Sequence, residues 1–251
     1  MSKLAIAHLS TVDAVMGGVI RAVGPYAPDA DLECSPFQAL AQAITHQQLN
    51  GTAARTILNR FVNACGDGSF PTPRAVLAAP ETTLRAAGLS FAKIAALKDL
   101  AAKTIAGIVP DHPTLHALAD GEIITRLTQV RGIGRWTVEM MLMFRLGRPD
   151  VLPVDDFGVR SGFRLAYGLR KMPAPLVLAA FGERWAPHRT VAAWYLWRAV
   201  ELARAGKLPA PLERTLLPRL RRRKKSKKGK KTQARPAVRS TKKAPPKRAR
   251  K

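Results

Sequence analysis

The sequence of 251 residues has few cysteines and no long apolar segment. Its two cysteines, Cys34 and Cys65, are too few for a disulfide framework, an iron–sulfur cluster or a four-cysteine zinc site. No apolar run approaches the roughly 18 residues that a transmembrane helix needs. Polar residues interrupt the apolar N-terminal stretch at His8, Ser10 and Asp13, which argues against a signal peptide. We therefore expect an intracellular protein, in the cytoplasm or nucleoid of a bacterium or in the nucleus of a eukaryote.

Acidic residues are also scarce, and the excess of positive charge is unevenly distributed. The chain has 42 Lys and Arg against 17 Asp and Glu, a net charge of +25. Residues 219–251 contain 18 of these basic residues and no acid, which leaves 24 basic and 17 acidic residues, or +7, in 1–218. The charge favours nucleic acid over a membrane, because no amphipathic basic helix accompanies it. We expect residues 216–251 to form a disordered arm that binds DNA non-specifically, or else a tail that only aids solubility.

Signals for β-strands are missing as well, because no segment alternates apolar and polar residues between turn signals. Helix signals are frequent. Ser35 followed by Pro36 predicts a helix N-terminus, apolar spacing predicts helices over 52–64 and 188–205, and Gly88 predicts a helix C-terminus. The sequence therefore predicts an all-α fold.

Two glycines mark the most informative segment, LTQVRGIGRWTVEMML at 127–142. The pattern indicates a helix, a tight turn through Gly132 and Gly134, and a second helix. The first amides of a helix have no internal partner, and together with the helix dipole they suit a phosphate. We therefore predict phosphate binding by Gly132, Gly134, Arg135 and Trp136. Taken alone, the pattern fits a purely structural helix–turn–helix equally well.

The segment VLPVDDFGVR at 151–160 places an acidic pair at the start of another helix. Together with the hairpin, this segment resembles the helix-hairpin-helix DNA glycosylase superfamily. Two further segments, AITHQQLNGTAA at 43–54 and WAPHRTVAAWYLW at 185–197, resemble its alkylpurine branch, of the 3-methyladenine DNA glycosylase II type. The resemblance covers about residues 35–205. It implies a helical DNA-glycosylase fold for residues 1–215, with two lobes around a cleft.

The resemblance also implies a catalytic residue and a reaction type. The family pattern is a proline, two variable residues and then an aspartate, which selects Asp156 after Pro153 and leaves Asp155 at the helix entry or facing solvent. An anion here would stabilise the positive charge that develops on the sugar. Capping of the following helix is the alternative role for Asp156. Members that also cut the strand have a lysine where this chain has Trp136, so we expect hydrolysis without strand cleavage.

The same resemblance assigns residues to the base and to the DNA duplex. Trp136, Trp197 and Phe157 are expected to line the base pocket, with ordinary core packing as the alternative. Gln48 and Leu49 are expected to wedge into the duplex once a base is flipped out. Their alternative roles are a polar helix end and a core residue, respectively.

The implied function needs no catalytic metal or cofactor. The backbone carbonyls of Thr128, Val130 and Ile133 are expected to hold a structural Na⁺ or K⁺ ion, as in the family. The expected partner is double-stranded DNA with damaged bases, bound by a monomer without membrane association. The resemblance favours excision of 3-methyladenine and 7-methylguanine. A glycosylase for uracil, hypoxanthine or 8-oxoguanine, and a non-catalytic DNA-binding protein, are the alternatives.

Overall fold

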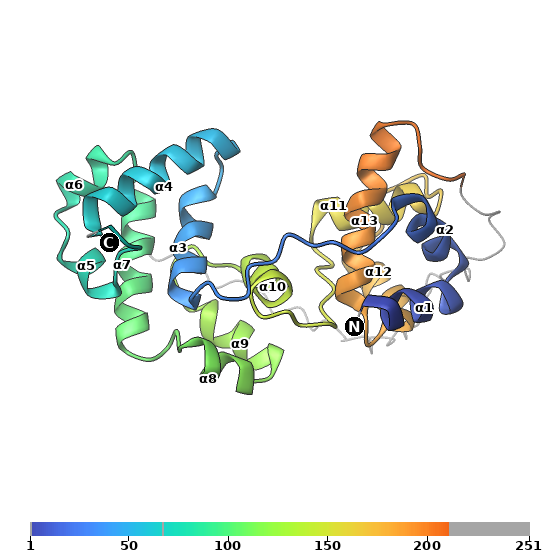
Figure 1. Cartoon of the computed structure of the whole chain (residues 1–251), viewed down its shortest axis with the longest axis horizontal. Coiled ribbons are helices and arrows are strands. Elements are labelled where there is room, and N and C mark those ends of the chain that lie inside the picture. The colour runs from blue at the N-terminus through green and yellow to red at the C-terminus, as the bar shows by residue number, and fades with distance from the viewer. Residues whose placement is uncertain (1, 67, 211–251) are drawn as a thin grey trace, which may run out of the picture. The chain divides into compact units, whose positions relative to one another are not determined.

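The computed structural model describes residues 2–66 and 68–210, which are helical and contain no strand (Figure 1). The predicted all-α fold is thereby confirmed for this part of the chain, whereas the basic arm predicted at 216–251 lies outside the described residues. None of these helices is long and apolar enough to cross a membrane. The helices are α1 (Ser2–Val12), α2 (Ala14–Val23), α3 (Pro36–His46), α4 (Gly51–Cys65), α5 (Pro73–Ala78), α6 (Glu81–Ala86), α7 (Phe91–Ile105), α8 (His112–Ala117), α9 (Asp120–Leu127), α10 (Arg135–Phe144), α11 (Phe157–Ala166), α12 (Pro175–Gly182) and α13 (Arg189–Arg204), with a 3₁₀ turn at Glu183–Trp185.

Local signals account for several helix ends. The Ser35 hydroxyl accepts a backbone N–H in the first turn of α3 at 3.2 Å, and Pro36 occupies the first helical position. Gly88 follows α6 with a φ of +98°, a left-handed conformation that favours glycine. The helices predicted over 52–64 and 188–205 are α4 and α13.

Helices α1, α2, α11 and α13 pack against one another. A Cβ at Gly162 of α11 would overlap the carbonyl oxygen of Leu196, so the glycine permits the close contact with α13. The buried Asp13 caps α2 and also accepts hydrogen bonds from Tyr167 Oη at 2.6 Å and Trp185 Nε1 at 2.9 Å. These bonds satisfy a carboxylate that would otherwise be costly to bury.

Helix α7 packs against α3, α5 and α6, while α10 contacts α3 and α9. Ile94, Leu97, Leu100 and Ala101 recur at helical spacing along α7 and are all buried. The rest of the α7 surface, away from these apolar residues, therefore remains available for polar contacts.

The segment 145–156 joins α10 to α11 and is fastened to the start of α13. Arg189 contacts Asp150 twice, through Nε to Oδ1 and Nη2 to Oδ2, both at 2.8 Å. The Thr190 hydroxyl donates to the Arg148 carbonyl at 2.6 Å. These contacts restrain the loop that ends at Asp156.

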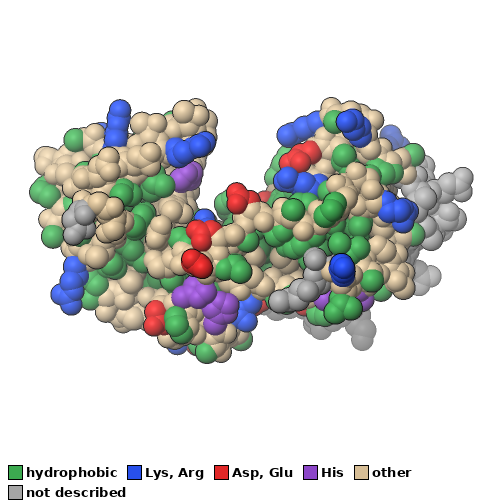
Figure 2. Space-filling model, viewed as in Figure 1, with side chains coloured by type: hydrophobic (Ala, Val, Ile, Leu, Met, Phe, Trp, Pro, Cys, Tyr) green, Lys and Arg blue, Asp and Glu red, His purple; other side chains and the backbone are tan. Residues whose placement is uncertain are grey.

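The space-filling view shows a hollow in one face of the molecule (Figure 2). Acidic side chains lie at the floor of this hollow and on one wall, and Lys and Arg side chains lie on both walls. Cations placed in this way suit a polyanion whose backbone follows the walls.

Candidate active site

The hairpin runs from the end of α9 to the start of α10. Gly132 has a φ of +78° and needs the freedom of glycine, whereas Gly134 has an ordinary φ of −95°. The chain turns through both glycines, and only Gly132 needs a left-handed conformation, while Gly134 is the N-cap of α10. No side chain caps α10, and a Cβ at Gly134 would meet nothing within 4 Å. The first amides of α10 thus face open space, as a phosphate site requires.

Arg135 extends from the first turn of α10, and its side chain is 64 % exposed. Its Nε lies 2.8 Å from Oε1 of Glu139, whose side chain is only 5 % exposed. Burial raises the pKa of Glu139; the Arg135 charge opposes this shift, and the charges of Asp155 and Asp156 add to it. The ion pair holds Arg135 beside the hairpin and leaves its terminal nitrogens accessible.

Asp156 is the N-cap of α11 and accepts three hydrogen bonds. Its Oδ1 accepts from the Val159 amide at 2.7 Å and from Trp197 Nε1 at 2.8 Å, and its Oδ2 accepts from Trp136 Nε1 at 2.7 Å. The donors come from α11, α13 and α10, so three helices fix the carboxylate. Asp156 therefore does cap α11. It is half-buried, whereas Asp155 is exposed.

The two tryptophans do more than sequence analysis predicted. They were expected as flat surfaces for a base, and the structure shows that both also donate an indole N–H to Asp156. Trp136 keeps 49 % of its surface exposed, and the Trp197 ring lies 5.9 Å from that of Phe144. Sequence reasoning missed the donor role because it depends on where two distant helices place their side chains.

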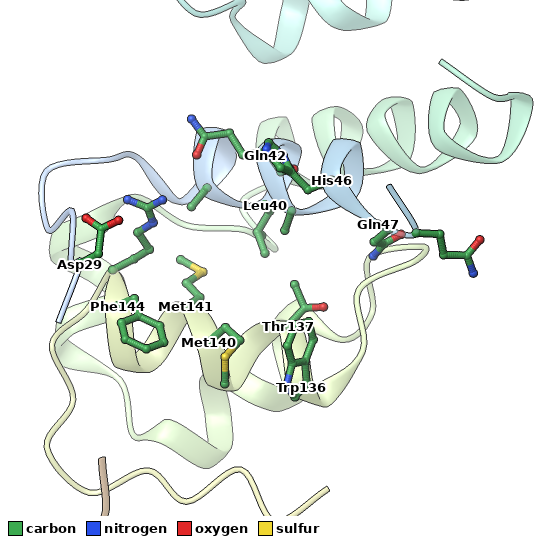
Figure 3. A pocket seen from close by; sticks show the side chains of 14 residues that line it. Asp29, Leu40, Gln42, His46, Gln47, Trp136, Thr137, Met140, Met141 and Phe144 are labelled. Carbon is green, nitrogen blue, oxygen red and sulfur yellow. The ribbon is translucent and has the colours of Figure 1, made fainter. Parts of the chain in front are cut away.

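A cavity of about 680 Å³ lies between α3 and α10 (Figure 3). This volume lies within the usual range for small-molecule sites. Trp136 lines it, and Thr137 and Met141 of α10 point toward α3. Other lining residues that sequence reasoning did not select include Gln42, His46, Met140 and Phe144. Their helical spacing on α3 and α10 was visible, but not the gap between the two helices.

The structure does not bring every predicted pocket residue into this cavity. Phe157 is 73 % exposed at the start of α11 and is absent from the lining, as is Trp197. Asp156 also lies outside the lining and is linked to it by the hydrogen bond from Trp136. The cavity and the carboxylate therefore share one residue, Trp136.

The predicted wedge residues follow α3 directly. Gln48 has a φ of +57°, the left-handed region that non-glycine residues rarely adopt. Leu49 is 38 % exposed, so its alternative role as a core residue is wrong. Gln47 donates from Nε2 to the Gly132 carbonyl at 2.8 Å, which joins this turn to the hairpin.

The carbonyls predicted to hold a monovalent cation lie in the turn between α9 and α10. Backbone carbonyl oxygens are hard ligands that suit Na⁺ or K⁺. The Val130 carbonyl already accepts the Ile133 amide at 3.0 Å, which leaves its second lone pair for an ion. Binding of an ion by Thr128, Val130 and Ile133 stays a prediction. The described residues contain no group of three or more His, Cys, Asp or Glu side chains that could hold a metal.

Comparison with known proteins identifies the class that this fold and site define. Residues 41–187 match the model of the HhH-GPD superfamily base excision DNA repair proteins. The chain therefore belongs to the HhH-GPD superfamily.

Individual relatives show which members of this superfamily the chain is similar to. DNA-3-methyladenine glycosylase 1 of Schizosaccharomyces pombe is 42 % identical over 197 residues, which cover 78 % of this chain and 86 % of that protein. The solved structure of the S. pombe 3-methyladenine DNA glycosylase in complex with abasic DNA has a TM-score of 0.72 and covers 79 % of this chain and 97 % of that one. A DNA-3-methyladenine glycosidase from Bacillus halodurans is 32 % identical with a TM-score of 0.73, covering 80 % and 91 %.

Proposed function

We propose that this protein is a monofunctional DNA glycosylase of base excision repair. It flips alkylated bases such as 3-methyladenine or 7-methylguanine out of duplex DNA and hydrolyses the N-glycosidic bond. One observation carries the proposal: the Asp156 carboxylate is held by the indole N–H of Trp136, a residue that also lines a cavity large enough for a base. The names of the relatives agree with this function.

The reaction breaks the bond between the base nitrogen and C1′ of the deoxyribose. The electron pair leaves with the base, so that a cationic alkylpurine departs as a neutral molecule, and positive charge develops on the sugar. Asp156 stabilises that charge and accepts a proton from the water that adds to C1′, leaving an abasic site. Because Trp136, Trp197 and the Val159 amide already fix the carboxylate, little reorganisation is needed.

The cavity suits an electron-poor ring. Trp136 and Phe144 are aromatic residues of its lining, and attraction of a cation to an aromatic face contributes roughly 0.5–2 kcal/mol. Met140 and Met141 add polarisable sulfur atoms beside them. A purine that carries a positive charge before it leaves needs less help from an acid, so one carboxylate is sufficient.

The duplex is bound by other groups of the same region. The amides of Gly132, Gly134 and Trp136, with the guanidinium of Arg135, bind phosphate oxygens at the start of α10. Flipping a base costs a few kcal/mol of stacking and pairing, and Gln48 and Leu49 fill the gap that remains. The basic walls of the hollow attract the flanking backbone (Figure 2).

The test is chromatographic analysis of the bases that the protein releases from methylated DNA. The wild type releases 3-methyladenine or 7-methylguanine, and Asp156→Asn lowers the rate by at least about 100-fold while leaving DNA binding largely intact. Asp155→Asn is the matched control and keeps the wild-type rate, since Asp155 is exposed. Full activity of Asp156→Asn removes the proposed mechanism.

Borohydride trapping tests the absence of strand cleavage. Trp136 has no amine that could attack C1′, so no covalent adduct with DNA forms and strands break only after alkali or heat. A borohydride-stable adduct contradicts the proposal. Single-lesion duplexes with uracil, hypoxanthine or 8-oxoguanine show whether a neutral base is preferred instead.

A further inference from the structure

One face of α7 carries polar residues that neither the core nor the proposed chemistry uses. Lys93, Asp99 and Lys103 recur along the helix at the spacing that places side chains on one side, with the small Ala96 between them. All three side chains form hydrogen bonds to two other segments of the described chain. These segments are the end of α3 and the hairpin before α10.

Lys93 binds the end of α3. Its Nζ donates to the Thr45 carbonyl at 2.7 Å, one of the last carbonyls of a helix that ends at His46. A cation at this end of a helix is also favoured by the helix dipole. The turn with Gln48 and Leu49 begins two residues after α3, so Lys93 fixes the base of that turn. Burial lowers the pKa of Lys93.

Asp99 and Lys103 bind the hairpin. The Arg131 amide donates to Asp99 Oδ2 at 2.7 Å, and Lys103 Nζ donates to the Gln129 carbonyl at 2.6 Å. Lys103 also contacts Asp99 at 2.7 Å, which orients both side chains. Burial acts to raise the pKa of Asp99, but the hydrogen bonds and charges of Arg131 and Lys103 outweigh it, so the pKa is lowered.

The two segments also meet each other directly. A Cβ on Gly132 would lie 3.5 Å from Ala96, so the hairpin rests on the small residue at the middle of this face. The Gly132 carbonyl accepts Gln47 Nε2 at 2.8 Å, and Gln47 immediately precedes Gln48. The wedge turn and the phosphate-binding hairpin are therefore fastened to α7 and to one another.

We propose that Lys93, Asp99 and Lys103 are positioning residues that hold the wedge turn and the phosphate-binding hairpin at a fixed separation. This inference rests on the proposed function. A phosphate bound at the start of α10 then lies at a set distance from the step that Gln48 and Leu49 enter. Without these residues, the hairpin still binds a phosphate, but the wedge no longer enters the adjacent step reliably.

The experiment measures unstacking of DNA without any base release. The probe is a duplex with a tetrahydrofuran abasic analogue next to 2-aminopurine, whose fluorescence rises when it unstacks. At saturating protein, the wild type raises the fluorescence, and Asp99→Ala and Lys93→Met lower that rise at least about threefold, as does Leu49→Ala. Asp99→Asn retains an acceptor for the Arg131 amide and restores most of the signal.

Glu122→Ala is the matched control, because Glu122 forms the same i,i+4 ion pair with Arg126 on α9. It keeps the wild-type fluorescence. Thermal unfolding of each variant separates positioning from stability, since Asp99→Ala and Asp99→Asn are compared at temperatures where both are folded. If Asp99→Ala does not fold, Lys103→Met replaces it with the same expectation.

The proposal is overturned if Asp99→Ala and Lys93→Met raise the fluorescence as much as the wild type does. It is also overturned if Asp99→Ala and Asp99→Asn lose the same amount of signal. No rise with the wild type also overturns it, because then no wedge enters. Since the probe contains no base to release, these results are independent of glycosylase activity. Absence of base release from methylated DNA refutes only the proposed function.

Discussion

Gly158 is the residue that allows Trp197 to reach Asp156. A Cβ at this position would lie 2.6 Å from Trp197 Cδ1 and 3.1 Å from Asp156 Oδ1. Real Cβ atoms do not come so close to a ring atom, so only glycine permits the indole N–H to donate to the carboxylate. The chemistry at Asp156 thus depends on a residue that has no side chain.

Gly158→Ala is expected to displace the Trp197 indole and slow base release by about tenfold or more, which corresponds to at least one charge-assisted hydrogen bond. Single-turnover release from methylated duplex DNA measures this change. Gly121→Ala is the control, because Gly121 is also the second residue of a helix and its Cβ would meet nothing within 4 Å. Equal rates for the two variants would contradict the role of Gly158.

Glu139 makes the stability of the folded protein depend on pH. Its pKa is raised in the folded protein, chiefly by burial, so the folded state binds the proton more tightly than the unfolded state. The stability that this proton contributes is present below the ordinary glutamate pKa of 4.5 and is lost as pH rises through the raised value.

Glu139→Gln is therefore expected to become more stable relative to the wild type as pH rises from about 4 to 7. Melting temperatures of both proteins across this range test it. A difference that is constant with pH, or that falls as pH rises, would contradict the raised pKa.

At the scale of elements, the turn after α3 combines strain with exposure. Gln48 adopts a left-handed φ of +57° and Leu49 is exposed, although both follow a well-capped and buried helix. Strain of this kind persists only where surrounding contacts impose it, and it is frequent at ligand-binding sites. The hydrogen bond from the Gln47 side chain to the Gly132 carbonyl is one such contact.

Gln48→Gly is expected to stabilise the protein by up to about 1 kcal/mol, because glycine adopts a positive φ without strain. The same change slows release of alkylated bases from duplex DNA, since the wedge side chain is lost. Release from single-stranded methylated DNA changes little, because its bases are already unstacked. Calorimetry and paired rate measurements on both substrates test this, and a loss that is equal on both substrates would exclude the wedge role.

At the scale of the whole molecule, charge is divided between residues 1–218 and residues 219–251, which contain all the basic residues of the arm. The first part carries a net charge of +7 with an acidic site, and the arm carries 18 basic residues. Affinity that comes from an unspecific basic segment depends steeply on salt, whereas hydrolysis depends on Asp156.

Deleting 219–251 is expected to flatten the dependence of DNA affinity on salt and to leave base release at low salt intact. Fluorescence anisotropy between about 50 and 200 mM salt gives the slope, and base release from methylated DNA gives the activity. Loss of base release at low salt would show that the arm takes part in the reaction.

The sequence by itself determined several helix ends, the hairpin with Gly132 and the position of Asp156 at a helix N-terminus. These features depend on neighbours a few residues away, through capping, glycine conformation and helical spacing. Only the tertiary structure decided which groups meet at the site. Trp136 and Trp197 reach Asp156 across 20 and 41 residues, and Gln47 reaches Gly132 across 85. No local pattern encodes such contacts, because they arise from how the helices pack.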